Sequence, residues 1–410
     1  MGDGRISRFH SSLRVVPELR LDVHSQSQPS GFGGGNRSFR PGRQSVYSAV
    51  RAPQSPFCEL HQGTAFCSLA VIPAAGQASK SSGKPYPPPR LADGHPDLQG
   101  VYDLGTLTPL ERPSGAKPVL TREEAEKQEG AFEARRRRLN APSRPDRPAP
   151  PKGGDGSTGA AGGVGGYNNF WLDPGSKYNV VDGQFRTSLI IDPPDGRIPP
   201  YTAATSQRVA ALRGRPTSDA QENRQPGQDP PGSYDNPEQR PLSERCILGF
   251  GSTSGPPALP DYFYNNLHQI VQTPDTVVIL SEMIHDARVI RINAPHLPKA
   301  IRRWMGDSVG HWEGDTLVVD TTNFTNKTRF RGSTEDLHVV ERFSRVDDHT
   351  LLYRFTIDDP NTWDRPWTGE YVWPQSTQPI YEYACHEGNY AFGDILRGAR
   401  VQESEAAVGR

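Results

Sequence analysis

Residues 245–398 contain the feature that most constrains the fold of this chain: a succession of short stretches in which apolar and polar residues alternate. A period of two places one face of a strand against a core and the other face towards solvent. The clearest example is a hairpin, in which residues 337–346 and 350–357 flank an Asp-Asp turn. Because long helices do not alternate with these stretches, the pattern argues against a doubly wound α/β sheet.

The region predicts a mostly β domain over residues 244–400, with about eight short antiparallel strands in meander order. The other expected strands are 266–272, 276–283, 287–293, 367–373 and 380–384, with two more that meet at the corner Gly314-Asp315. Most connections are short, so a sandwich and an up-and-down barrel both fit, and the meander order favours a barrel-like, lipocalin-like cup. Small barrels of this kind often hold one ligand in their interior.

The chain outside this domain has a different composition. Of 410 residues, 41 are Gly and 40 are Pro, a proportion at which much of the chain is expected to be irregular. Residues 79–243 predict a Pro/Gly-rich arm that wraps over a surface and is not a domain of its own. One helix is expected within the arm, over residues 121–140, because Thr121 and Glu124 form a capping box. Residues 401–410 are expected to be a tail.

Residues 1–78 are expected to be a leader. The run 64–78 is apolar and ends in Gly76 and Ala78, which are small enough for signal-peptide cleavage; the alternative is a short buried segment. Residues 1–63 are rich in Arg, Ser and Gly, which an overlong assigned start or a disordered leader would explain. We therefore expect an exported protein, periplasmic or secreted. No run approaches the roughly 20 apolar residues of a transmembrane helix, so no transmembrane segment is expected.

Two cysteines, Cys246 and Cys385, follow the expected leader. In an exported chain they could form one disulfide that joins the first strand of the β domain to its last segment. The alternative is a pair of buried, inert thiols. No C-x-x-C pair occurs, so the usual cysteine type of structural zinc site is not expected.

The charge of the chain restricts the choice of partner. A formal net charge of −1 provides no attraction to nucleic acid or to anionic membranes. A small-molecule substrate or ligand is the expected partner. The oligomeric state is left open by the sequence.

One serine lies in a nucleophile-like motif. Residues 306–310, Gly-Asp-Ser-Val-Gly, match the G-x-S-x-G pattern of esterases and lipases, with Ser308 as the nucleophile and His311 as a possible local base. That motif requires a strand before the serine and a helix after it, whereas the residues that follow here predict a strand. Ser308 is therefore either a nucleophile or an ordinary turn serine.

Two histidines have carboxylates beside them in the sequence. His285 precedes Asp286, and His386 precedes Glu387. Imidazole is the side chain best suited to proton transfer near neutral pH, and a neighbouring carboxylate fixes its tautomer. If the two pairs meet in the barrel mouth, they could act as base and acid; a histidine alone is more often a structural hydrogen-bond donor. The four residues could also bind a divalent metal, but their spacing matches no ligand signature, so neither a metal nor a cofactor is expected.

Three residues are candidates for contacting a substrate. Arg342 could pair with a substrate carboxylate if it points inward, although strand alternation could equally place it outside. Trp312 and Tyr383 belong to a dense set of aromatic residues in the second half of the chain. Most such residues are ordinary barrel core, and some could line a pocket.

Four longer segments carry a resemblance to a known family. The segments are RTSLIIDPPDGRIPP, DSVGHWEGDTLVVDTTNFT, ERFSRVDDHTLLYRFTIDDPNTW and YEYACHEGNY. Together they resemble a family of exported bacterial proteins to which no chemistry is assigned, and the resemblance spans roughly residues 82–398. It implies export, and it identifies no catalytic residues.

Three functions fit these observations. The favoured one is an exported hydrolase, acting on an ester or related bond by His/carboxylate chemistry in the barrel mouth. The alternative is a non-catalytic barrel that binds a small molecule, resembling lipocalins, and the third is a structural or envelope-interaction protein. Converging His and carboxylate groups would favour the first, a deep aromatic cavity the second, and a filled barrel the third.

Overall fold

The computed structural model describes residues 86–141, 172–212, 234–252, 255–261 and 264–408. The expected leader, residues 1–78, lies outside the described residues, as do the last two residues of the expected tail.

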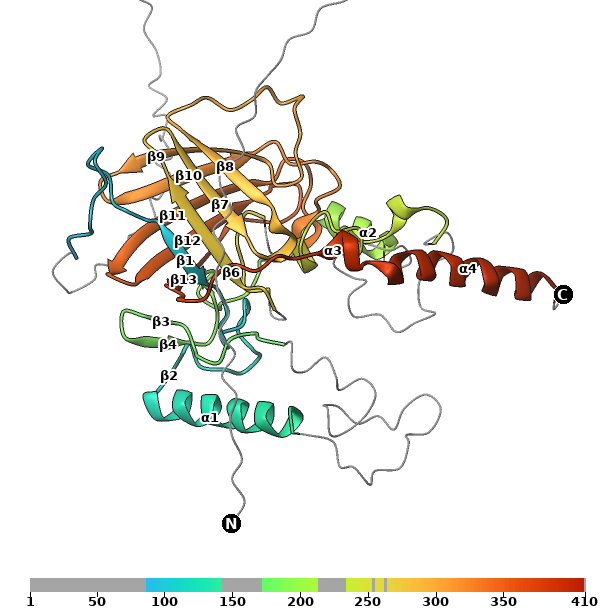
Figure 1. Ribbon diagram of the computed structural model, residues 1–410, viewed down its shortest axis with the longest axis horizontal. Coiled ribbons are helices and arrows are strands. Elements are labelled where there is room, and N and C mark those ends of the chain that lie inside the picture. Colours follow the sequence, from blue (N-terminus) through green and yellow to red (C-terminus); the bar gives the residue numbers. More distant parts are fainter. Residues whose placement is uncertain (1–85, 142–171, 213–233, 253–254, 262–263, 409–410) are drawn as a thin grey trace, which may run out of the picture. The chain divides into compact units, whose positions relative to one another are not determined.

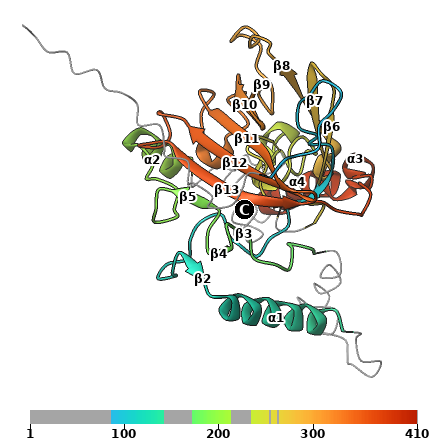
Figure 2. The ribbon, with the colours of Figure 1, turned by 90° about the vertical axis from the view of Figure 1, so that its left-hand side faces the viewer.

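Ten strands form one sheet that curls into a half-barrel (Figures 1 and 2). In spatial order the strands are β1 (Gly100–Asp103), β6 (Leu267–Gln272), β7 (Thr276–Ser281), β8 (Ala287–Ile292), β9 (Asp307–Glu313), β10 (Thr316–Thr322), β11 (His338–Asp347), β12 (Thr350–Asp358), β13 (Trp367–Pro374) and β5 (Ile190–Asp192). The expectation of a mostly β fold is confirmed, and the predicted hairpin is the β11–β12 pair.

Two details of the expected meander are wrong. Strands β8 and β9 pair in parallel, so residues 293–306 must cross back to the starting end of the sheet. Residues 380–384 form no strand; the Tyr381 N–H donates to the Glu282 side chain, and the Tyr383 carbonyl accepts from His285. Side chains satisfy these backbone groups, so this segment needs no neighbouring strand.

The arm supplies strands to the sheet. Strand β1 pairs with β6 and β5 pairs with β13, both antiparallel. An isolated bridge joins Tyr102 of β1 to Gln375, just after β13, and the Ser376 N–H donates to the Val101 carbonyl at 2.7 Å. A bridge of this kind is no continuous ladder, so the described sheet is a half-barrel, and a closed lipocalin-like barrel stays a prediction.

The expected helix of the arm is α1 (Arg122–Leu139). Its capping box is present: the Glu124 N–H donates to Thr121 Oγ1 at 3.1 Å, and the Thr121 N–H donates to Glu124 Oε2 at 2.8 Å. The remaining elements are the small sheet β2 (Val119–Leu120), β4 (Gln184–Arg186) and β3 (Val180–Val181), the helices α2 (Ala203–Leu212), α3 (Cys385–Gly388) and α4 (Tyr390–Val408), and the 3-10 turns η2 (Pro237–Gln239), η3 (Phe250–Ser252), η4 (Met283–His285) and η5 (Phe330–Gly332). Most of the expected tail continues α4 as helix, through Val408.

The concave face of the sheet is packed with aromatic side chains. Trp367, Tyr371 and Trp373 of β13 are completely buried. Part of a loop fills the same interior: the Ala258 N–H donates to Tyr353 Oη, and Tyr371 Oη donates to the Ala258 carbonyl, both at 2.9 Å. In the described residues, the interior is therefore occupied by the chain's own groups.

The same interior buries one histidine. His268 is 1% exposed, its Nε2 has no partner among the described residues, and its ring packs 5.7 Å from that of Trp373. Burial, the largest effect, lowers the pKa of His268 to about 4. The hydrogen bond to the Asn266 backbone acts to raise this pKa, and the positive charge of Arg288 acts to lower it further. The folded protein therefore keeps this imidazole neutral at pH values where the unfolded chain protonates it.

We expect acid to destabilise the fold through His268. The folded pKa lies below the unfolded value of 6.5, so stability is lost as the pH falls below 6.5 towards 4, by about 3 kcal/mol from this group. His268→Phe, which keeps an aromatic ring but cannot titrate, should reduce this pH dependence in urea unfolding. An unchanged slope between pH 6.5 and 4 would contradict the assignment.

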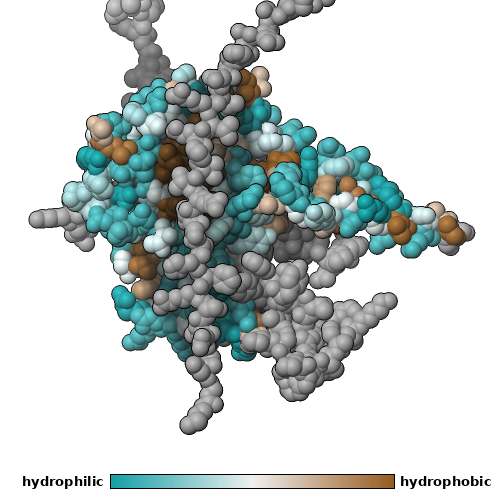
Figure 3. All heavy atoms as spheres, viewed as in Figure 1, coloured by the Kyte–Doolittle hydropathy of each residue, from teal (hydrophilic) through white to brown (hydrophobic). Residues whose placement is uncertain are grey.

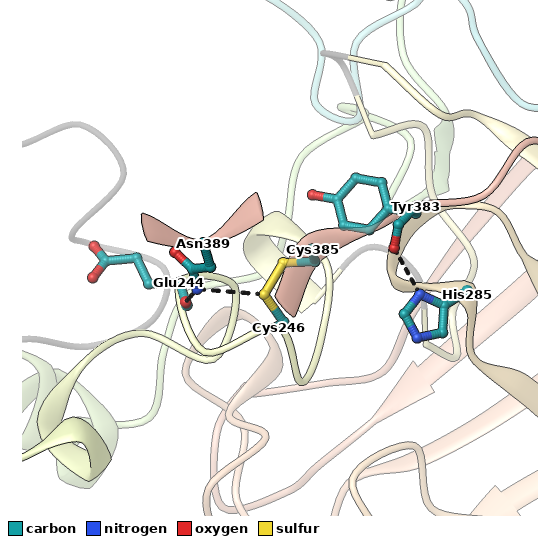
Figure 4. Close-up of a disulfide and its surroundings, with 6 residues drawn as sticks. All are labelled: Glu244, Cys246, His285, Tyr383, Cys385 and Asn389. Carbon is teal, nitrogen blue, oxygen red and sulfur yellow. Dashed lines mark hydrogen bonds between the residues drawn. A yellow bond between two sulfur atoms is a disulfide. The ribbon is translucent and has the colours of Figure 1, made fainter. Parts of the chain in front are cut away.

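The predicted disulfide between Cys246 and Cys385 is present, with a Cα–Cα distance of 5.8 Å. The expectation that it begins in the first strand of the domain is wrong: Cys246 lies in a loop ahead of β6, and Cys385 begins α3. Asn389 Nδ2 donates to the Glu244 carbonyl at 2.7 Å and approaches Cys246 Sγ at 3.5 Å (Figure 4).

On the face shown in Figure 3, hydrophilic residues predominate and apolar residues occur in small separate groups. None of the helices in the described part of the chain is both long and apolar enough to cross a bilayer.

Candidate active site

Ser308 lies within strand β9 and faces the interior of the sheet. Its side chain is 3% exposed, and its Oγ is 2.9 Å from Thr321 Oγ1 on the neighbouring strand. Strand β9 is followed by strand β10 and not by a helix. The sharp strand-to-helix turn that the esterase motif requires is therefore absent from this segment. The hydroxyl pairs with another hydroxyl, and His311 lies on the opposite face, hydrogen-bonded to Glu313 at 3.2 Å.

The His285 and His386 pairs are not brought into a common centre. The His285 imidazole is exposed, and its Nδ1 is 2.9 Å from the Tyr383 carbonyl, as Figure 4 shows. His386 and Glu387 lie exposed in the short helix α3, and Asp286 is half-buried. In the described residues no hydrogen bond or ion pair joins the two predicted pairs.

The predicted substrate contacts are also separate from one another. Arg342 faces outward and donates to Glu313. The Trp312 ring stacks on His95 with centroids 4.8 Å apart. The ring of Tyr383 stacks on Tyr264, and burial raises its pKa.

A different set of histidines and carboxylates does form a continuous chain. His296 Nδ1 is 3.0 Å from Asp307 Oδ2, and His296 Nε2 is 2.9 Å from Asp320 Oδ1. The second oxygen of Asp320 is 2.7 Å from His338 Nε2. At the other end, Arg291 Nη2 donates to both oxygens of Asp307 at 3.0 Å. These five residues form what we call the His–Asp chain.

Strand alternation explains why the His–Asp chain lies on the outer face of the sheet. In β10, Val319 and Thr321 are completely buried, so Asp320 between them points outward. In β11, Val339 is completely buried, so His338 beside it also points outward. Neighbouring strands thus place a carboxylate and an imidazole on one face.

The crossover between β8 and β9, residues 293–306, carries His296 over this face. The Leu297 N–H donates to Asp307 Oδ2 at 2.8 Å, and Asn323 Nδ2 donates to the Leu297 carbonyl at 2.9 Å. Gly306 ends the crossover with φ +71°, and a Cβ there would lie 2.6 Å from the Thr322 carbonyl oxygen. Glycine therefore lets the loop close against β10 directly before Asp307.

The electrostatics of the His–Asp chain favour charged carboxylates. For Asp320, burial acts to raise the pKa, but the hydrogen bonds from His338 and His296 outweigh it and lower the pKa below its usual value. For Asp307, burial is likewise outweighed, here by the Leu297 N–H, His296 and Arg291. Both carboxylates therefore stay ionised near neutral pH.

Asp320 has the opposite effect on its neighbour. Its hydrogen bond, opposed by burial, raises the pKa of His338 above 6.5. Because the folded pKa is the higher one, this pair stabilises the fold fully below about pH 6.5. Its contribution is lost as the pH rises through the folded pKa.

The two imidazoles have different capabilities. Both nitrogens of His296 face carboxylate oxygens, so donating to both requires a proton on each nitrogen. His338 binds a carboxylate through Nε2 only; its Nδ1 has no partner among the described residues, and its side chain is 38% exposed. His338 can therefore exchange a proton with a molecule in solvent, while Asp320 fixes its orientation.

The oxygens and nitrogens of the His–Asp chain face one another in sequence and do not point at a common centre. Consistent with that geometry, no group of three or more His, Cys, Asp or Glu side chains in the described residues is placed to hold a metal ion.

The sequence analysis predicted none of the five residues of this site, although two of them carried a signal. His338 was visible as a histidine at the start of a predicted strand, and Asp320 as a polar residue in a β-branched run. Their contact depends on the register of β10 and β11, which a 15-residue connection (323–337) separates. His296 lies in an irregular loop, where no periodicity marks its direction.

Comparison with known proteins adds no identification. The sequence matches no family model and no curated protein, and the structure matches no solved structure.

Proposed function

We propose that this chain is an exported hydrolase, acting on an ester or related bond, in which His338 is the general base and Asp320 orients it. The observation that carries the proposal is the 2.7 Å contact between His338 Nε2 and Asp320 Oδ2, on a ring whose Nδ1 has no partner among the described residues and whose side chain is 38% exposed. A base held by a carboxylate on one nitrogen and open on the other is the arrangement that proton transfer requires. Export rests on the apolar run at 64–78 and on the family resemblance.

The proposed reaction uses water as the nucleophile. His338 Nδ1 takes a proton from a water molecule as its oxygen attacks the carbonyl carbon of the substrate. The tetrahedral intermediate then collapses, the bond to the leaving group breaks, and the leaving oxygen takes the proton from the His338 imidazolium. His296 donates to Asp320 from the other side, which holds the carboxylate in place.

The activity prediction concerns Asp320→Asn. On a panel of chromogenic esters, lactones and glycosides, assayed with and without chelator, the wild-type rate should rise with pH through the pKa of His338. We expect Asp320→Asn to reduce the rate about 10²-fold. The rise of the rate with pH should also shift to lower pH, because the carboxylate that raises the pKa of His338 is gone.

Two matched variants separate this site from other His/carboxylate pairs. Glu313→Gln removes the partner of His311 on the same face of the sheet, and His386→Ala removes one of the two histidines that the sequence favoured. Both should retain the wild-type rate and pH profile. Loss of activity in His386→Ala together with full activity in Asp320→Asn would overturn the assignment.

A measurement without substrate tests the same point. In histidine-labelled protein, NMR titration should show one imidazole, absent from His338→Gln, with a pKa above 6.5 that falls in Asp320→Asn. If the His338 resonance titrates identically in the wild type and in Asp320→Asn, the coupling on which the proposal depends is ruled out.

A further inference from the structure

A cleft of about 290 Å³ lies where the arm meets the outer face of the sheet. It is lined by strand β4, by the segment around β5 and by strands β12 and β13, all within residues 78–410. Three arginines contribute to it: Arg112 and Arg186 from the arm, and Arg354 from β12. Besides the arginines, Glu370 is the charged residue in the lining and Ser188 is the residue there with a hydroxyl group.

Glu370 is 2% exposed and is shared by two of the arginines. Arg186 Nη1 donates to its Oε1 at 2.8 Å, and Arg354 Nε donates to its Oε2 at 2.7 Å. Arg112 is the third cation and makes no contact with this carboxylate. Three positive charges against one negative charge leave the lining with a net charge of +2.

The turn after β5 holds Arg112 in place. The Arg112 N–H donates to the Gly196 carbonyl, and Arg112 Nη1 donates to the Pro194 carbonyl, both at 2.8 Å. Gly196 has φ +71°, and a Cβ there would lie 2.9 Å from the guanidinium carbon of Arg112 and 2.5 Å from Ser188 Oγ. The absence of a side chain at this turn makes room for the guanidinium group. Its Nε is buried without a partner in the described residues.

The environment strengthens the field of these charges. The side chain of Arg186 is 15% exposed and that of Arg354 is 31% exposed, so both guanidinium groups are largely withdrawn from water. Charges act more strongly where protein replaces water, and guanidinium groups bind phosphate with paired, directional hydrogen bonds. A phosphate dianion matches the net charge of +2 on the lining.

We infer that this cleft binds a phosphate group, either as free phosphate or as part of a small phosphate monoester. The site is distinct from the proposed active site. Arg354 is four residues along β12 from Asp358, the cross-strand partner of His338, which places the two about 13 Å apart along the strand. Phosphate binding and hydrolysis can therefore each fail without the other.

The test is isothermal titration calorimetry of the full chain at low ionic strength. Inorganic phosphate should bind saturably to the wild type, and Arg112→Gln should weaken binding at least tenfold. This variant leaves Glu370 with both of its own partners. Arg112→Lys should weaken binding less, because it keeps the charge and loses only the planar donor pair.

Arg90→Gln is the matched control: Arg90 does not line the cleft, and like Arg112 it donates through Nη1 to a backbone carbonyl, that of Gly94 at 3.0 Å. It should bind phosphate as the wild type does. Phenyl phosphate in place of phosphate distinguishes the two sources: tighter binding supports a monoester, and weaker binding supports free phosphate. Absence of saturable binding of either, equal loss in Arg90→Gln and Arg112→Gln, or tighter binding of succinate than of both would overturn the inference. Thermal unfolding of each variant shows whether it is folded.

Discussion

Replacing Arg288 by methionine is expected to lower the free energy of unfolding by about 3–5 kcal/mol. Arg288 and Glu341 form a two-point ion pair on the concave face of the sheet, with Nη1–Oε2 at 2.5 Å and Nη2–Oε1 at 3.1 Å. Glu341 is completely inaccessible to solvent. Methionine fills a similar volume but, among the described residues, leaves a buried carboxylate with only the Tyr353 hydroxyl, which donates to it at 2.8 Å.

The double variant Arg288→Met/Glu341→Leu is the control for this prediction. Removing both charges also removes the uncompensated carboxylate, and paired replacements of this kind are often close to neutral. We expect the double variant to regain most of the stability that Arg288→Met loses, measured by urea unfolding. If the double variant is as unstable as the single one, lost packing accounts for the effect and the buried charge does not.

The success of sequence reasoning here follows the strength of local signals. A period-two pattern in two adjacent strands with a two-residue turn leaves one register, and β11 and β12 were predicted nearly to the residue. The capping box at Thr121 worked for the same reason, since both partners lie within one turn of helix. The prediction missed the parallel pairing of β8 and β9, because the irregular loop that joins them carries no periodicity.

The site was harder to predict because closeness in the sequence is not closeness in space. Asp286 follows His285 directly, yet the His285 ring binds a backbone carbonyl. His338 binds a carboxylate 18 residues earlier in the chain. Two strands must be in register, and alternation must orient both side chains outward, before that pair exists. A sequence of outward polar residues on neighbouring strands is the signal that could have indicated it.

The second large effect is expected from removing the disulfide. In Cys246→Ser/Cys385→Ser the free energy of unfolding should fall by about 5 kcal/mol, the value that the chain-entropy model assigns to a crosslink over this separation. The two cysteines are 139 residues apart in the sequence, so the crosslink restricts nearly the whole β domain in the unfolded state. Urea unfolding of the oxidised wild type and of the double variant measures the difference.

Asn389→Ala separates the crosslink from its surroundings. This variant keeps the disulfide and loses the hydrogen bond from Asn389 to the Glu244 carbonyl, which should cost about 1 kcal/mol. Helices α3 and α4 bury no residues, so the alternative outcome is the release of residues 376–408 alone. In that case the double variant would unfold at the wild-type urea concentration and be cleaved by protease in this segment. That pattern would show that the disulfide fastens the C-terminal segment without stabilising the sheet, and the prediction would fail.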